Sequence, residues 1–418
     1  MKRVILFKLL VSRMSTFNPV LFNGKLNIQE IYKEEMKVKR NLATKIVVFL
    51  AAAVLVIGML AACGKKEEPV PAPTASAAVT PGDADAAAAA AVDELIAAIQ
   101  VQEWTEGNDE RCAAAKAAWD ALTPAQKELV EEYDYFGKDT GDASQDDPLN
   151  QDGIGANEIL VVSFGTSFNQ SRTMDIGAIE HAIAEAYPDW SVRRAFTAQI
   201  IINHILARDG VKIDNVQQAL DRAVENKVQN LVVQPTHLMK GLEYGKLERI
   251  LAEHASSFDK TVLGGPLLSS DEDFSRVADA LIDASAEYED GTTALVFMGH
   301  GTEAAANGIY DRMQRVLAEK GKEDHFIGTV EAEPSLDDVI KAVKAGDYRR
   351  VVLRPLMLVA GNHAVNDMAS AENPDSWYSR FTAEGYETVC VIEGLGEIPA
   401  VRAVYAEHAH RAIASLEL

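Results

Sequence analysis

The chain contains the segment ILVVSFGTS at residues 159–167 and a similar segment, ALVFMGHGT, at residues 294–302. A second pair follows in the same order, with NLVVQPTHLMKG at residues 230–241 and RVVLRPLMLVAG at residues 350–361. In this second pair a proline and a glycine follow the apolar run at the same spacing. Short apolar runs that alternate with amphipathic helical stretches are typical of parallel strands covered by helices. The repeated pairs therefore predict two similar α/β halves.

We place these halves at residues 158–285 and 286–418. Their candidate strands are Ile159–Phe164, Asn230–Gln234, Lys260–Leu263, Ala294–Met298, Phe326–Val330, Arg350–Arg354 and Thr388–Ile392. In open α/β folds, ligands bind beyond the carboxyl ends of the strands. We therefore expect two flavodoxin-like halves with parallel sheets, whose strand-end loops line a central cleft.

Composition restricts the classes of partner. The chain has 418 residues, 48% of them hydrophobic and 25% charged, which predicts two or three globular units. Its net charge of −23 argues against a nucleic-acid partner, because phosphate binding requires a basic surface. The three cysteines, Cys63, Cys112 and Cys390, are too few for a disulfide framework or a zinc–thiolate cluster. Any metal must therefore be bound by histidines and carboxylates.

The start of the chain has the layout of an export signal. Basic residues between Met36 and Lys45 precede an uncharged apolar run, Ile46–Ala62, which ends in small residues before Cys63. This resembles the lipobox of bacterial lipoproteins. A transmembrane anchor is the alternative, but the run only reaches the lower limit of about 17 residues for spanning a bilayer. We expect a signal peptide at 36–62, lipidation of Cys63, and an extracytoplasmic protein anchored to the cell membrane by lipid.

Four further segments lie outside the two halves. Residues 1–35 precede the better start at Met36 and are expected to be a non-native upstream extension. Residues 63–91 are rich in Pro, Ala and Thr and are expected to be a flexible linker. Residues 92–136 have helical spacing and predict a small all-α module, which we interpret as a spacer between the membrane and the main domain. The polar residues 137–157 predict a second linker.

Three predicted strand-end loops of the second half carry side chains that can bind a metal. His300 lies between two glycines, Glu331 and Glu333 follow the next strand, and His363 lies in a third loop. Two neutral imidazoles and a carboxylate suit a divalent cobalt, nickel, iron or zinc ion and leave coordination positions open. Each histidine alone is more often a capping or core residue. Their common location at strand ends is what favours a site.

Several motifs together resemble one known family. They are SFGTS at 163–167, FMGHGT at 297–302, GTVEAEP at 328–334, PLMLVAGNHAVNDMA at 355–369 and GLGE at 394–397. From residue 158 to the end, the chain resembles the sirohydrochlorin cobaltochelatases of CbiK type, which are class II tetrapyrrole chelatases. The resemblance implies a bilobed α/β fold with a cleft for a flat tetrapyrrole. It matches His300, Glu331 and His363 to the metal-binding positions of the family, with Glu331 preferred to Glu333.

The resemblance also implies a reaction, in which cobalt(II) is inserted into a sirohydrochlorin-type tetrapyrrole and two protons are released. Iron and nickel are the other metals considered, and no organic cofactor is expected. A near-neutral histidine can accept a pyrrole proton, so we expect His300 to act as base while His363 and Glu331 hold the metal. One imidazole nitrogen cannot do both at once. The division of roles between the two histidines is therefore a hypothesis.

Other side chains are candidates for contact with the substrate. They are Ser163, Thr166, Arg193, Arg194, His237 and Arg354. The arginines, with Lys240, could pair with substrate carboxylates, and the hydroxyl groups could donate hydrogen bonds. Each arginine could instead be a solvated surface residue, and each hydroxyl group a helix cap. His237 lies on the loop that repeats Arg354–Gly361 and could face the same cleft.

The export signal leaves a second function open. Cobalt insertion for cobalamin synthesis belongs in the cytoplasm, whereas this chain is expected to be exported. The alternative is a surface lipoprotein that binds a metal, or a metallated tetrapyrrole such as haem, for uptake without catalysis. The two functions differ in turnover, since a receptor binds stoichiometrically and a chelatase releases product. The sequence leaves open whether the chain forms a homo-oligomer.

Overall fold

The structure, a computed structural model, describes residues 81–416. The predicted upstream extension, the signal peptide, Cys63 and the first part of the linker lie outside these residues. Within residues 81–416, no helix is both long enough and apolar enough to cross a membrane.

The first described part is helical. It comprises α3 (Pro81–Ile99), α4 (Asn108–Ala121), α5 (Pro124–Lys127) and α6 (Asp134–Gly137). The small all-α region predicted before the α/β halves is thus present. Its first helix begins at Pro81, which corrects the prediction that the linker extends to residue 91. The segment that we expected to be a tether contains a run of alanines, and alanine has the highest intrinsic helix propensity.

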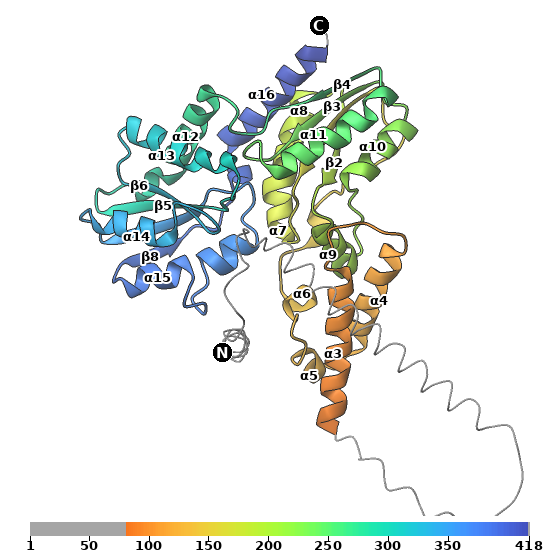
Figure 1. The fold of residues 1–418 in the computed structure, drawn as a ribbon, viewed down its shortest axis with the longest axis horizontal. Helices are drawn as coiled ribbons and strands as arrows, with labels where there is room; N and C mark the ends of the chain where they lie inside the picture. Colours follow the sequence, from red (N-terminus) through yellow and green to blue (C-terminus); the bar gives the residue numbers. More distant parts are fainter. Residues whose placement is uncertain (1–80, 417–418) are drawn as a thin grey trace, which may run out of the picture. The chain divides into compact units, whose positions relative to one another are not determined.

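The helical region is packed onto the α/β part through α9 (Gln199–Asp209). Asn108 Nδ2 donates to Asn203 Oδ1 at 2.9 Å, and Asn203 Nδ2 donates to the Ile99 carbonyl at 2.8 Å, both in a buried environment. The rings of Tyr135 and His204 stack with their centroids 3.9 Å apart. Figure 1 shows α3 and α4 beside α9. This region is therefore docked on the α/β part, and its interpretation as a spacer between the membrane and the main domain stays a prediction.

The first half contains a parallel four-stranded sheet. Its strands are β1 (Asn157–Ser163), β2 (Ser191–Phe196), β3 (Asn230–Pro235) and β4 (Lys260–Leu263), in the order β2-β1-β3-β4. Its helices include α7 (Asn169–Ser171), α8 (Ala178–Ala186), α10 (Val216–Glu225) and α11 (Leu242–His254). β2 was not among the predicted strands, because SVRRAF carries two arginines in its centre and lacks a continuous apolar run.

The second half repeats this arrangement. Its strands are β5 (Thr293–Gly299), β6 (His325–Thr329), β7 (Arg350–Pro355) and β8 (Glu387–Cys390), in the order β6-β5-β7-β8. Its helices are α13 (Gly308–Glu319), α14 (Leu336–Lys344), α15 (Trp377–Ala383) and α16 (Pro399–Leu416). α12 (Asp271–Ser285) lies within the predicted bounds of the first half but packs against α13, which moves the boundary between the halves to before residue 271. All pairs of neighbouring strands are parallel, as in the first half. The prediction of two similar parallel α/β halves is therefore confirmed.

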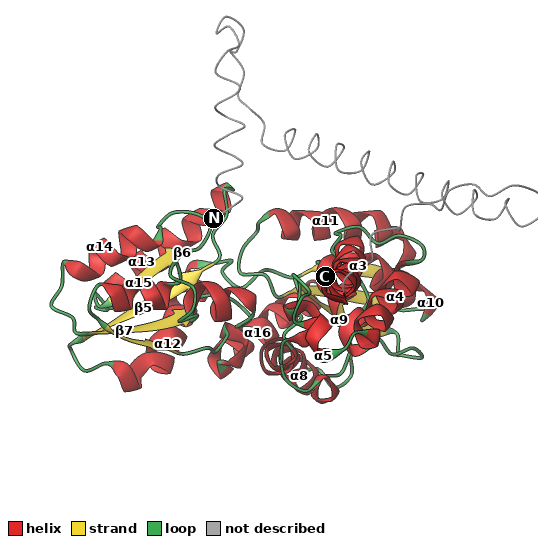
Figure 2. Ribbon diagram, turned by 90° about the horizontal axis from the view of Figure 1, so that it is seen from below, coloured by secondary structure: helices red, strands yellow, loops and turns green. Residues whose placement is uncertain are grey.

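Helices cover both sheets and also join the two halves. Figure 2 shows helices on either side of each sheet. The C-terminal helix α16 packs against α8, β3 and β4 of the first half as well as against α12 (Figure 1). Tyr405 of α16 is fully buried, and its hydroxyl donates to the Thr236 carbonyl. One apolar cluster consequently includes side chains of both sheets.

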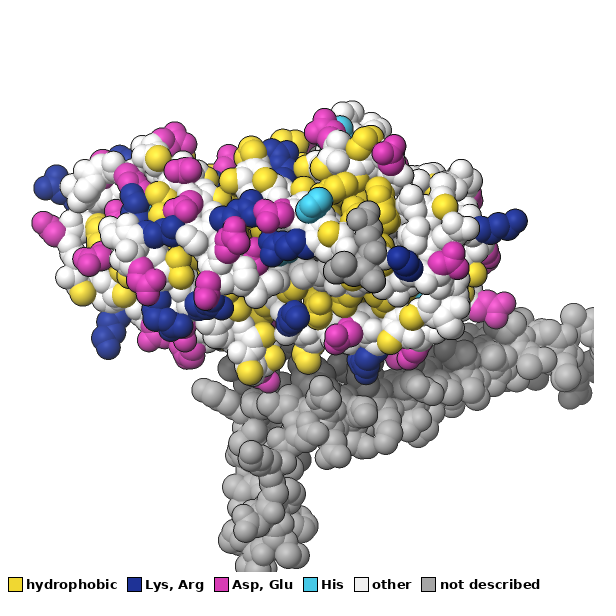
Figure 3. All heavy atoms as spheres, turned by 90° about the horizontal axis from the view of Figure 1, so that it is seen from above, with side chains coloured by type: hydrophobic (Ala, Val, Ile, Leu, Met, Phe, Trp, Pro, Cys, Tyr) yellow, Lys and Arg dark blue, Asp and Glu magenta, His cyan; other side chains and the backbone are white. Residues whose placement is uncertain are grey.

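Charged side chains of both signs are distributed over the surface. Figure 3 shows one face of the described part, on which acidic and basic side chains are interspersed and no continuous basic area is visible. This face therefore lacks the basic area that phosphate binding requires, in agreement with the prediction from the net charge.

Candidate metal centre

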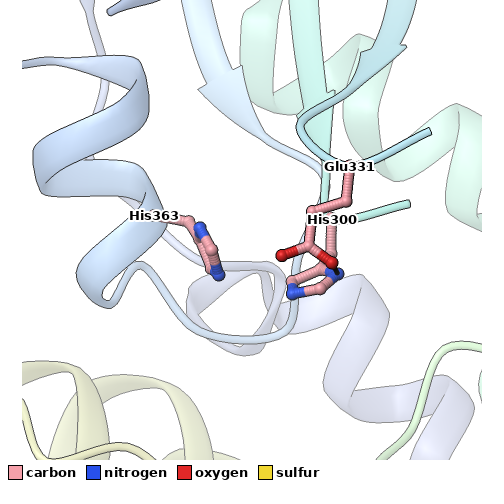
Figure 4. A group of neighbouring side chains, drawn as sticks. All are labelled: His300, Glu331 and His363. Atoms are coloured by element: carbon pink, nitrogen blue, oxygen red, sulfur yellow. Dashed lines mark ion pairs between the residues drawn. The ribbon is translucent and has the colours of Figure 1, made fainter. Parts of the chain in front are cut away.

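Three side chains of the second half converge beyond the carboxyl ends of its strands. His300, Glu331 and His363 each offer a ligand atom, and these atoms lie within 4.8 Å of one another (Figure 4). The two imidazole rings are nearly perpendicular, with centroids 4.7 Å apart. His300 Nδ1 is 3.7 Å from Glu331 Oε2. Residues from three separate loops thus form one set of nitrogen and oxygen donors.

The position of His300 depends on the glycines on either side of it. A Cβ on Gly299 would overlap the buried ring of Tyr310, and a Cβ on Gly301 would lie 2.9 Å from the Ala332 amide nitrogen. Gly301 also has a φ of +86°, which side chains disfavour. Its amide donates to the Tyr310 hydroxyl at 3.2 Å. The loop can therefore pack closely against α13 and against the turn that carries Glu331.

Main-chain hydrogen bonds hold Glu331 beside His300. The Val330 amide donates to the Gly299 carbonyl at 3.0 Å, and the Glu331 amide donates to the His300 carbonyl at 2.9 Å. Glu333 is engaged elsewhere, since its carboxylate accepts from the Ser335 amide at the start of α14. The structure therefore brings Glu331, rather than Glu333, to the two histidines.

His363 is the first residue of a π-helical segment, η7 (His363–Met368). Such segments often occur at functional sites. His363 Nδ1 lies 2.6 Å from Asp367 Oδ2. A proton on Nδ1 would be donated to this carboxylate, which leaves Nε2 free to bind a metal. His300 Nδ1 lies 2.9 Å from the Gly301 carbonyl, so the same tautomer is favoured there.

The three ligand side chains are accessible to solvent. The exposed fractions of the His300, Glu331 and His363 side chains are 47%, 56% and 33%. Three protein ligands leave at least one position of a four-coordinate ion open. An open and accessible centre suits a metal that arrives and leaves, whereas a permanently bound structural ion is usually enclosed.

Arg193 and Arg194 do not reach the cleft, which corrects their assignment as substrate-binding residues. Both lie in the middle of β2 and are buried. Arg193 pairs with Glu158 at 2.7 Å, and Arg194 pairs with Glu180 at 2.5 Å and with Asp146 at 2.7 Å. These guanidinium groups neutralise buried carboxylates. Burial nevertheless raises the pKa of Glu158 to about 7, above the ordinary range of a carboxyl group.

Arg354 and Ser163 are also buried and engaged within the protein. Arg354 donates to Glu393 and to the Ala284 carbonyl, both at 2.8 Å. The Ser163 hydroxyl accepts from Thr236 Oγ1 at 2.7 Å. Both side chains are thus buried and have partners within the protein, so their assignment to the substrate is corrected as well.

Thr166 and His237 differ from this group. Thr166 Oγ1 accepts from the Phe168 amide at 3.1 Å, and it also lies 3.1 Å from the position of a Cβ on Gly361, two residues before His363. The His237 ring nitrogens are buried and have no hydrogen-bond partner among the described residues. Burial lowers the pKa of His237 to about 4, so the imidazole is neutral at physiological pH. Thr166 is thus the predicted substrate residue that contacts the loop of the metal centre.

The sequence analysis missed two residues that position the centre, Asp367 and Tyr310. The pair His363 and Asp367 has the i, i+4 spacing at which side chains meet on a helix, and this signal was present in the motif NHAVND. Tyr310 lies in α13 and had no comparable signal, because its contact with Gly301 depends on the packing of α13 against the strand-end loop.

Residues 157–414 match the family model described as cobalt chelatase (CbiK). The chain belongs to this cobalt chelatase family. It is 38% identical over 255 residues to a sirohydrochlorin cobaltochelatase of Salmonella typhimurium, covering 61% of this chain and 96% of that protein. It is 31% identical over 261 residues to the sirohydrochlorin cobaltochelatase CbiKC of Nitratidesulfovibrio vulgaris, covering 62% of this chain and 91% of that protein.

A solved structure, SirB from Bacillus subtilis with Fe3+, is 14% identical to the chain. It aligns with a TM-score of 0.45 and covers 63% of this chain and 98% of its own. The family match begins at residue 157, so the helices α3 to α6 precede the chelatase domain.

Proposed function

We propose that the protein is a sirohydrochlorin cobaltochelatase, which inserts cobalt(II) into a sirohydrochlorin-type tetrapyrrole and releases two protons. The observation that carries this proposal is the accessible set of His300, Glu331 and His363 at the strand ends of a cobalt chelatase domain. Cobalt is a substrate of this reaction. The two curated relatives, which share more than nine tenths of their length with the chain, support the same activity.

The geometry supports distinct roles for the two histidines. His363 is oriented by Asp367 and presents Nε2, which suits a metal ligand. His300 lies beside the Glu331 carboxylate, with its Nδ1 3.7 Å from Glu331 Oε2. We assign His363 and Glu331 to the metal and His300 to the acceptance of a pyrrole proton. Because each ring has one nitrogen engaged with the protein, the metal and the proton go to different histidines.

The location of the protein is a separate proposal. The basic stretch, the apolar run and Cys63 support export and lipid anchoring outside the cytoplasm. Mass spectrometry of the membrane fraction should find lipid on Cys63, and Cys63→Ala should abolish it. An unmodified Cys63 in the membrane fraction would contradict the proposal.

The proposed export also supports a second candidate function, a surface lipoprotein for capture without catalysis. A lipoprotein that captures a metal or a metallated tetrapyrrole would need the same accessible donors. Iron and nickel remain alternative metals, and a homo-oligomer remains open. The number of turnovers distinguishes a chelatase from a capture protein.

The test is anaerobic cobalt(II) insertion into sirohydrochlorin by the full-length chain, followed by the tetrapyrrole absorption spectrum. Full length is required because Asp146 and the helices α3 to α6 pack against the chelatase domain. Multiple turnovers are expected, with a large loss in His300→Ala and His363→Ala. His181→Ala is the matched control, because its side chain is 74% exposed and lies on α8, outside the centre. A stoichiometric spectral shift without turnover would favour the capture protein.

A further inference from the structure

The two halves are equivalent strand by strand, and this equivalence identifies a counterpart of the metal centre in the first half. Val162 pairs with Pro235 in the first sheet, as Met298 pairs with Pro355 in the second. A glycine with positive φ lies three residues after Val162 and three residues after Met298. Its φ is +101° at Gly165 and +86° at Gly301. Phe164 therefore occupies in the first half the position that His300 occupies in the second.

The main-chain hydrogen bonds of the two strand-end loops agree with this assignment. The Ala198 amide donates to the Phe164 carbonyl at 3.2 Å, as the Glu331 amide donates to the His300 carbonyl. Ala198 is thus the counterpart of Glu331. Counting eight residues on from the paired prolines places Glu243 at the position of His363. The first half consequently has Phe, Ala and Glu where the second half has His, Glu and His.

These three counterparts line one pocket of about 380 Å³. The wall is completed by residues of α10 and α11 and by the loop between α3 and α4, which supplies Gln102 and Trp104. The side chains of Phe164 and Trp104 are 48% and 49% exposed, which is unusual for large aromatic residues. Lys246 also lines the pocket and pairs with Glu243 at 2.5 Å.

The helical region holds Trp104 at this pocket. Asn203 of α9 binds the end of α3 through the Ile99 carbonyl and the start of α4 through Asn108. Within the intervening loop, Arg111 Nη2 donates to Thr105 Oγ1 at 2.6 Å. Since the family match begins at residue 157, Trp104 is an addition to the chelatase domain. The docked helices thus bring an aromatic side chain to the strand ends of the first half.

The side chains of the pocket do not suit a second metal centre like that formed by His300, Glu331 and His363. They suit a ligand with a flat conjugated ring. The pocket contains no histidine, whereas exposed aromatic faces attract flat conjugated systems by stacking. Lys246 can bind a carboxylate, whereas the side-chain amides of Gln199 and Gln217 already donate within the protein, to Asn203 and Asp221. A pocket of this volume lies at the lower end of the range for small-molecule sites, so it fits the edge of a large macrocycle.

The loop that carries Phe164 also approaches the loop that carries His363. Thr166, two residues after Phe164, contacts Gly361, two residues before His363.

We propose that this pocket binds one pyrrole ring of the tetrapyrrole and a carboxylate arm on that ring, by stacking on Phe164 and Trp104. The inference rests on the proposed function, because it takes the tetrapyrrole from it. It assigns the helices α3 and α4 a part in substrate binding.

The experiment is a titration of the metal-free, full-length protein with sirohydrochlorin, monitored by tryptophan fluorescence and by tetrapyrrole absorbance. Trp104→Ala and Phe164→Ala should each raise the Kd for the tetrapyrrole about fivefold or more, because each removes one stacking face. Trp104→Phe keeps an aromatic face and should retain most of the affinity. Leu129→Ala is the matched control, because Leu129 is 51% exposed in the helical region and does not line the pocket.

Cobalt binding without tetrapyrrole separates this inference from the proposed function. It should be unchanged in the Trp104 and Phe164 variants, which shows that they fold and keep the metal centre. If the wild-type protein turns over and both alanine variants bind the tetrapyrrole with wild-type affinity, the inference is overturned and the chelatase function stands. Tetrapyrrole binding that depends on Trp104, without turnover, would support the pocket and overturn the chelatase. If the wild-type protein binds no tetrapyrrole, both proposals fail.

Discussion

The bond between Asp367 and His363 gives a quantitative prediction about metal affinity. Asp367→Ala removes the acceptor 2.6 Å from His363 Nδ1, so the ring loses its preferred tautomer and orientation. Loss of such a partner typically lowers metal affinity about 10- to 100-fold. The two side chains are 33% and 38% exposed, and solvent screens the charge of the pair. We therefore expect the lower end of this range, about tenfold or about 1.4 kcal/mol.

Competition between the protein and a chromophoric chelator for cobalt(II), under anaerobic conditions and without tetrapyrrole, measures this effect. Asp367→Asn keeps a carbonyl acceptor and should lose less affinity than Asp367→Ala. Asp375→Ala changes an exposed aspartate eight residues further along the chain, between η7 and α15, and should bind cobalt as the wild type does. The reasoning is refuted if Asp367→Ala has wild-type affinity while His363→Ala has lost binding.

Three further predictions concern stability and the shape of the centre. Asp146→Ala leaves the buried Arg172 and Arg194 with a single carboxylate, and it should lower the free energy of unfolding in urea by about 3–5 kcal/mol. Asp120→Ala removes one partner of an exposed ion pair, and it should lower the free energy of unfolding by less than about 1 kcal/mol. Burial raises the pKa of Asp175 to about 8, so its contribution to stability is complete below about pH 4 and is lost as the pH rises towards 8. Asp175→Asn should therefore weaken the fall in stability between about pH 5 and pH 8, and an unchanged pH profile in urea unfolding would contradict this. Gly301→Ala should reduce cobalt affinity at least about tenfold, because its Cβ would press on the Glu331 turn, while Gly321→Ala, at a similar φ but in open space, should leave cobalt affinity unchanged.

The repeated sequence segments predicted the fold well because they are the central strands of the two sheets. Buried parallel strands are continuous apolar runs, and β1, β3, β5 and β7 have this pattern. β2 was missed because its burial depends on charge pairing with residues far along the chain, including Asp146 and Glu180. The polar sequence around Asp146 predicted a linker. Its carboxylate is in fact buried, because it pairs with Arg172 and Arg194, and this pairing cannot be seen in the local sequence.

The metal centre could be predicted because each ligand lies in a loop region that follows a strand, and the carboxyl ends of parallel strands meet at one edge of a sheet. The substrate contacts could not be predicted in this way. The side chain of an arginine or serine in a strand points to one face of the sheet or the other. Only the packed structure shows whether a carboxylate or a hydroxyl group lies on that face and pairs with it. Arg354, at the end of β7, is turned towards Glu393 and the α12 carbonyl of Ala284.

The described residues contain one set of His, Glu and His ligands, although each of the two sheets has an edge at which the carboxyl ends of its strands meet. The comparison of the two halves explains this difference. Both halves keep the features that shape the loop, namely the glycine with positive φ and the hydrogen bonds between the loops. They differ in the side chains that the loops present, His300 in one and Phe164 in the other. A tetrapyrrole needs a metal at its centre and support at its edge, and these needs call for different chemistry. A duplicated scaffold can meet both by keeping its backbone and exchanging three side chains.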